Sequence, residues 1–253
     1  MSRTKNRARE QGSKKRSLEN VDGTENDHSS KRQASKPPPP RRPTEVDETI
    51  AMMDPALLAD HCAKTMRKHN PKSSSIELEE QCLPTKAFRD TTSFAGIHST
   101  GRLGAFLEQF TENGKTVLTA CDAEAAPHTL VIAPSGIRAA DLYRELRVFN
   151  SEQSKVAKFI AKHMKLQENV EYMQKNKVGI VIGTPARIMD VIAAGAIKPG
   201  SVRRIVVDGS YCDEKKRNIF GMRELFQPLQ ALLNLEAFRT RYSTQDRLEI
   251  LVF

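Results

Sequence analysis

The sequence of 253 residues contains no tryptophan, and aromatic residues make up only 6% of it. No apolar stretch approaches the roughly 18 residues that a membrane-spanning helix needs, and the N-terminus lacks the apolar segment of a signal peptide. From these absences we expect a soluble protein that is not secreted and has no membrane partner. The length admits one substantial domain with a tail, and it is too short for a two-domain helicase.

Cysteine is scarce as well, and none of the cysteines forms a C-x-x-C pair. The nearest histidines, His61 and His69, do not give zinc-finger spacing. We therefore predict reduced thiols, as is usual in the cytosol or nucleus, and neither a metal site nor a cofactor. The four cysteines are Cys62, Cys82, Cys121 and Cys212.

Positive charge is concentrated at one end of the chain. Residues 1–42 hold 12 basic and 5 acidic side chains, a net charge of +7, so only +2 of the total of +9 belongs to the remaining residues. A basic tail on a nearly neutral body is typical of a nucleic-acid or nuclear-import arm, and it argues against a groove-binding fold.

Residues 1–47 form the predicted tail. They are basic and rich in proline, and they contain too few large apolar residues to offset the entropy of ordering them. We predict that the tail is disordered and that it directs the protein to the nucleus or contacts nucleic acid; a merely solvated charge run is the alternative. Two basic clusters resemble a two-part import signal: Lys14, Lys15 and Arg16, and then Lys31 and Arg32.

The remaining residues, 48–253, predict one α/β domain with a helical extension at its start. Asp54 and Pro55 are typical of a helix N-terminus, and that helix should continue to His69. Short apolar runs then alternate with helical patterns, which predicts a mostly parallel sheet flanked by helices. The expected strands are 129–133, 156–161 (where a helix is also possible), 178–182, 202–207 and 247–253. The expected helices are 103–110, 137–149, 166–176, 185–194 and 221–235, and residues 72–96 should be irregular.

The ends of three predicted strands resemble motifs of DEAD-box RNA helicases. Leu130–Ser135 is similar to the segment that leads into Ala-Pro-Thr-Arg, and Ile182–Ile188 is similar to the one that leads into Gly-Thr-Pro-Gly-Arg. Arg204–Asp208 stands where the helicase strand runs into Asp-Glu-Ala-Asp. Together, and in this order, they resemble the first RecA-like domain of that superfamily.

Further segments resemble the Cms-one family of the small-subunit processome, a nucleolar pre-ribosome particle. They are Gly136–Leu142, Lys155–His163, and Ile205–Asp208 followed by Lys215–Arg217. This resemblance implies a degenerate RecA-like domain in a non-enzymatic ribosome-biogenesis factor of the nucleus and nucleolus. It implies pre-ribosomal RNA and processome proteins as partners, and no small-molecule substrate. The alternative is a minimal ATP-binding or ATPase domain that acts with an RNA helicase partner.

The residues that phosphoryl transfer requires are incomplete in the sequence. Asn113–Thr116 is similar to the end of a P-loop, but Gln109 stands where the first glycine is needed, and a helix is predicted to precede the segment. We expect a surface loop there. Asp208 occupies the metal-binding position of the helicase motif, whereas Gly209 replaces the glutamate that would orient water. We therefore predict no catalytic residue.

RNA contact is expected at the loops that follow two of the strands. The resemblance implies that they hold RNA phosphates without reading sequence. The alternatives are that Thr184 caps the next helix and that Arg187, expected at the surface, pairs with Asp190. The candidate residues are Ser135, Gly136 and Arg138 in the first loop, and Thr184 and Arg187 in the second.

Overall fold

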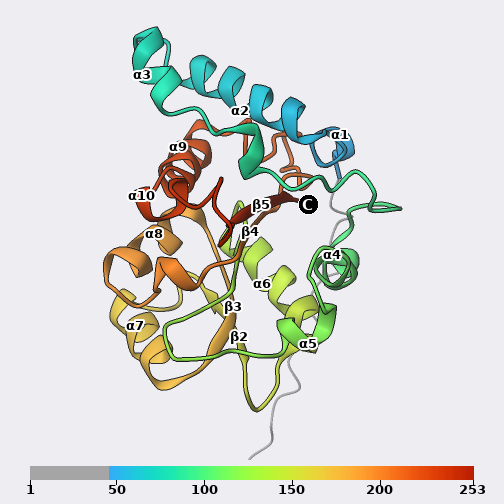
Figure 1. Cartoon of the computed structure of the whole chain (residues 1–253), viewed down its shortest axis with the longest axis vertical. Helices are drawn as coiled ribbons and strands as arrows, with labels where there is room; N and C mark the ends of the chain where they lie inside the picture. The colour runs from blue at the N-terminus through green and yellow to red at the C-terminus, as the bar shows by residue number, and fades with distance from the viewer. Residues whose placement is uncertain (1–45) are drawn as a thin grey trace, which may run out of the picture. The chain divides into compact units, whose positions relative to one another are not determined.

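A five-stranded sheet, with all of its strands parallel, lies at the centre of the computed structural model, which describes residues 46–253 (Figure 1). The order of the strands is β2-β3-β1-β4-β5. The predicted α/β class is therefore confirmed, and the segment for which a helix was also possible forms β2. The strands are β1 (Thr129–Ile132), β2 (Lys155–Phe159), β3 (Val178–Gly183), β4 (Arg204–Val207) and β5 (Glu249–Val252).

Burial on both faces of the sheet explains the continuous apolar runs. Along β1, Leu130 and Ile132 belong to one hydrophobic core, while Val131 belongs to a second core on the other face. All four residues of β1 and all six of β3 are buried. Because successive side chains point to opposite faces, both faces require apolar residues.

The helices cover the two faces as two separate layers (Figure 1). The first core contains side chains of α1 (Glu48–Ala51), α2 (Pro55–His69), α7 (Leu166–Lys175), α8 (Pro185–Ala193), α9 (Arg223–Leu233) and α10 (Glu236–Arg239). The second core contains side chains of α4 (Leu103–Gln109), α5 (Gly114–Leu118) and α6 (Gly136–Leu146). As expected, α2 begins with Asp54 as its cap, and the Asp54 carboxylate accepts a hydrogen bond from the Leu57 N–H at 2.8 Å.

Two short helices differ from the sequence-based predictions. Residues 72–96, expected to be irregular, contain α3 (Ser75–Glu80), which begins with a capping box. The Glu77 N–H donates to the Ser74 hydroxyl at 3.3 Å, and the Ser74 N–H donates to the Glu77 carboxylate at 2.8 Å. The segment Asn113–Thr116, expected to be a loop, begins α5 instead, with Asn113 in the left-handed conformation at φ 57°.

A segment from before α4 covers the β5 edge of the sheet. Beside β5, Phe88 forms a parallel bridge with Ile250, and the Arg89 N–H donates to the Ile250 carbonyl at 2.8 Å. The Thr91 hydroxyl extends this contact to the Val252 carbonyl at 3.4 Å. The segment from Phe88 to Thr91 therefore covers the β5 edge and fixes Arg89 next to the start of that strand.

Some predictions concern residues outside this description. Residues 1–45 are not described, so the disordered tail and the import signal at Lys14, Lys15, Arg16, Lys31 and Arg32 stay predictions. Within residues 46–253, no helix combines the length and the apolar character needed to cross a membrane.

Burial of His128 predicts a pH dependence of folding. Burial, together with the nearby charge of Arg204, lowers the pKa of His128 to about 4. In the unfolded chain the ring should bind a proton near its ordinary pKa of about 6.5. Since the unfolded state then holds more protons between these values, stability is full above pH 6.5 and falls as the pH falls toward 4.

We expect the free energy of unfolding to drop by roughly 2 kcal/mol from this residue between about pH 7 and pH 5. Urea unfolding across this range measures it. His128→Gln should be less stable at pH 7, and its free energy of unfolding should depend less steeply on pH. If the slope equals that of the parent, His128 is not the source of the pH dependence. His61 and His98, whose pKa values burial also lowers, contribute with the same sign in both proteins.

Candidate functional site

The candidate site lies at the edge of the sheet where β1, β3 and β4 end. Ser135 begins the helix after β1, Thr184 follows β3, and Asp208 follows β4. Because these three strands are adjacent and parallel, their carboxyl ends meet, as the sequence predicts. This edge is where a RecA-like domain would place its ligands.

The Asp208 carboxylate forms an ion pair with an arginine from the neighbouring helix. Arg138, in the first turn of α6, donates from Nε to Oδ2 of Asp208 at 2.7 Å and from Nη2 to Oδ1 at 3.0 Å. Both side chains are buried. The guanidinium thus satisfies both carboxylate oxygens in a two-point geometry, and a metal ion would have to displace it.

Other groups hold the guanidinium of Arg138 in place. Its Nη1 donates to the Thr100 hydroxyl, and the Tyr211 ring centroid lies 4.9 Å from its Cζ atom. Burial raises the pKa of the Asp208 carboxyl, and the hydrogen bonds from Arg138 oppose that shift. Its charge is thus neutralised inside the protein, which argues against RNA contact, and the expected role of Arg138 in RNA binding stays a prediction.

Gly209 has no room for a side chain. A Cβ atom at this position would lie 2.7 Å from Cγ1 of Val252 and 3.2 Å from the Phe220 ring. Its N–H donates to the Phe253 carbonyl at 2.7 Å, which ties the end of β4 to the end of β5. Packing against β5 thus excludes a glutamate from the place where the helicase motif has one.

In the first loop, Ser135 and Gly136 have structural roles. The Ser135 hydroxyl accepts a hydrogen bond from the Arg138 N–H at 3.1 Å and so caps α6. At Gly136 a Cβ atom would lie 2.7 Å from Cγ2 of Ile160. This close contact explains why glycine stands where the helicases have arginine. Whether Ser135 and Gly136 contact RNA stays a prediction.

In the second loop, one of the two alternatives that the sequence suggests is confirmed and the other is wrong: Arg187 pairs with Asp190, but Thr184 does not cap α8 by a side-chain hydrogen bond. Thr184 occupies the capping position of α8, but its hydroxyl makes no capping hydrogen bond. Arg187 is only 7% exposed, in contrast to the expected surface position. Its Nη2 donates to the Met164 carbonyl, and its Nη1 lies 4.0 Å from the Asp190 carboxylate. The Thr184 hydroxyl is therefore not used to cap α8. Arg187 chiefly joins α8 to the segment before α7.

The P-loop-like segment lies away from this site. It follows α4, a helix, as the sequence predicts, and Nε2 of Gln109 donates to the Ser93 carbonyl at 3.3 Å. Residues 109–113 line the same groove as Arg204, the first residue of β4, and Arg203, which precedes it. Since Asp208 follows the other end of β4, Lys115 and Asp208 belong to opposite edges of the sheet.

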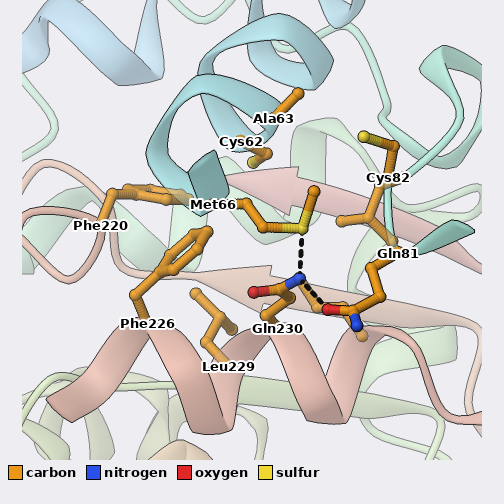
Figure 2. A pocket seen from close by; sticks show the side chains of 11 residues that line it. Cys62, Ala63, Met66, Gln81, Cys82, Phe220, Phe226, Leu229 and Gln230 are labelled. Carbon is orange, nitrogen blue, oxygen red and sulfur yellow. Dashed lines mark hydrogen bonds between the residues drawn. The ribbon is translucent and has the colours of Figure 1, made fainter. Parts of the chain in front are cut away.

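An apolar cavity between α2 and α9 was not predicted from the sequence. Figure 2 shows Gln230 reaching from α9 toward Met66 and Gln81, and its Nε2 donates to Oε1 of Gln81 at 3.0 Å. Burial raises the pKa of the Cys62 thiol, which lines this cavity, to about 12. Such a thiol stays protonated at neutral pH and is a poor nucleophile.

The four cysteines of residues 46–253, Cys62, Cys82, Cys121 and Cys212, form no disulfide bond, and their reduced state stays a prediction. Among residues 46–253 there is no group of three or more histidine, cysteine, aspartate or glutamate side chains arranged to hold a metal ion.

The fold and the site together define a parallel α/β domain. At the carboxyl ends of its strands, which we call the carboxyl edge, the polar side chains mostly form contacts within the protein. Comparison with known proteins is specific: the family model of CMS1, described as U3-containing 90S pre-ribosomal complex subunit, matches residues 1–253. The chain belongs to this family, which confirms the resemblance found in the sequence.

Named relatives come from fungi and vertebrates. Protein CMS1 of Chaetomium thermophilum is 41% identical over 202 residues, which cover 80% of each chain. Protein CMSS1 of Homo sapiens is 26% identical over 77% of this chain and 68% of its own length. Protein CMS1 of Saccharomyces cerevisiae is 26% identical over 74% of this chain and 64% of its own length.

The buried pair predicts a large loss of stability when only one partner is removed. Arg138→Met leaves the Asp208 carboxylate buried without a counter-ion, so we expect the free energy of unfolding to fall by about 3–5 kcal/mol. Arg144→Met is the matched control on α6: it breaks a half-exposed pair with Asp141, and the loss should stay below about 1 kcal/mol. Urea unfolding of both variants measures the difference. Equal losses would contradict a structural role for the Arg138–Asp208 pair.

Proposed function

We propose that this chain is a non-enzymatic subunit of the 90S pre-ribosome, which binds pre-ribosomal RNA and assembly proteins. The observation that carries the proposal is the two-point contact between Arg138 and Asp208, at the position where a helicase would hold its magnesium ion. Membership of the CMS1 family supports the ribosomal part, because the description of that family names the 90S pre-ribosomal complex.

The residues at the positions that phosphoryl transfer requires make other contacts in this domain. A nucleotide site requires a phosphate-binding loop, a carboxylate for the metal ion and a group that orients water. The loop-like segment belongs to the opposite edge of the sheet, Asp208 holds Arg138, and Gly209 packs against Val252. These contacts favour a scaffold over the alternative of a minimal ATP-binding domain.

The location and partners follow from the same proposal. A subunit of the 90S pre-ribosome works in the nucleus and the nucleolus, where its partners are pre-ribosomal RNA and proteins of the small-subunit processome. The charge of +7 on residues 1–42 suits both nuclear import and contact with RNA. At the carboxyl edge of the sheet, Thr184 offers a hydroxyl that the helix does not use.

The chain should not bind ATP. Titration of a fluorescent ATP analogue with Mg²⁺ should give no saturable binding below about 1 mM, because Arg138 neutralises the carboxylate that the metal ion would need. Lys115→Ala serves as the control. Micromolar binding that disappears in this variant would support the alternative of an ATP-binding domain.

The tagged chain should sediment with large particles that contain U3 RNA. Sucrose-gradient fractions of a nuclear extract, probed for the tag and for U3, test the ribosomal role directly. Removal of residues 1–42 should lower the nuclear fraction of the protein, because most of the net charge lies there. The ribosomal role is wrong if the tagged full chain stays at the top of the gradient, separate from U3.

A further inference from the structure

We propose that a groove at the amino edge of the sheet binds the phosphate backbone of single-stranded RNA. This inference rests on the proposed function, because pre-ribosomal RNA would supply the strand. Four arginines line the groove, whose volume is about 650 Å³: Arg89, Arg203, Arg204 and Arg247.

The groove lies at the opposite end of the strands from the candidate site. In the register of the sheet, Thr129 of β1, Arg204 of β4 and Glu249 of β5 are paired, and each is the first residue of its strand. Residues 109–113, which join α4 to α5, also line the groove. An RNA strand bound in this groove would not contact Asp208 or Thr184, so substitutions at the two ends of the sheet test the two sites independently.

The residues that line this groove carry more positive than negative charge, with four arginines against Glu112 and Glu249. Oε1 of Glu249 lies 3.4 Å from Nη1 of Arg89 and 3.7 Å from Nε of Arg247. Burial lowers the pKa of Arg204, and the same glutamate opposes that shift. Glu249 thus faces three guanidinium groups, and even with Glu112 in the lining the arginines leave positive charge for the phosphates of a ligand.

The arginines are held in position and remain accessible. Nη2 of Arg247 donates to the Lys86 carbonyl at 2.6 Å, and Nη1 of Arg204 donates to the Thr129 hydroxyl at 3.2 Å. Arg203 pairs with Asp246. The side chains of Arg89, Arg203 and Arg247 are still 40–50% exposed. Pinned, half-exposed guanidinium groups bind with a smaller loss of entropy than freely moving surface side chains.

The rest of the lining favours RNA over an acidic peptide. Phe110 lies in the groove and is half-buried, and its ring centroid is 5.0 Å from that of Phe106, which fixes it. An aromatic ring beside arginines is the arrangement on which unpaired bases stack. Asn113 and Gln109 add amide groups that suit ribose hydroxyls and base edges.

The test measures binding of the full chain to a fluorescently labelled oligouridine at several salt concentrations. Arg89→Gln combined with Arg247→Gln removes two phosphate contacts, so the affinity at about 0.1 M salt should fall roughly 25-fold and the salt slope should decrease by about 1.4. The matched control is Arg67→Gln combined with Arg223→Gln, which removes the same charge from exposed positions on α2 and α9. Circular dichroism confirms that both double variants are folded.

A second variant changes the affinity in the other direction. Glu249→Gln removes the shared carboxylate while keeping its shape, so it should bind the oligouridine more tightly than the parent does. The proposal is overturned if the groove pair and the control pair lose affinity equally. It is also overturned if the groove pair loses binding to a polyglutamate peptide but keeps its binding to RNA, because the groove would then serve an acidic protein. Sedimentation of the full chain with U3 stays a separate test, so this inference can fail while the proposed function holds.

Discussion

The buried ion pair between Arg138 and Asp208 determines what the carboxyl edge of this sheet can do. It joins the first turn of α6 to the end of β4, and Thr100 and Tyr211 complete the surroundings of the guanidinium. A buried carboxylate without a partner is costly, so the fold depends on keeping this arginine in place. The same contact occupies the carboxylate that nucleotide hydrolysis would need. Stability and the proposed absence of catalysis thus have one physical origin.

Much of the fold could be predicted because its determinants are local in the sequence. Val178 to Ile182 forms a short continuous apolar run bounded by a turn signal at Gly183 to Pro185, which is typical of a strand buried on both faces. Asp54 and Pro55 mark the beginning of α2 for equally local reasons. The capping box at Ser74 and Glu77 was also present in the sequence, although the short helix that follows it was predicted as irregular.

The roles of the arginines could not be predicted, because they depend on contacts between distant parts of the chain. Arg138 meets a carboxylate 70 residues away, and Arg187 meets a carbonyl 23 residues away. A basic residue after a strand is typical of a phosphate contact, but only the fold reveals whether its charge is already neutralised. The amino-edge groove was missed for the same reason. Its four arginines come from three separate segments of a body whose net charge is only +2.

The packing of Gly209 limits which substitutions this position tolerates. A glutamate at this position would collide with Val252, whose side chain is buried in the core, and would come close to the ring of Phe220. Introduction of that glutamate would therefore require coordinated changes on at least two other segments, and each of these alone would leave a void in a close-packed core. A glutamate can therefore be introduced at this position only together with smaller side chains at both of its close neighbours, so the backbone of this turn is committed to close packing between β4 and β5.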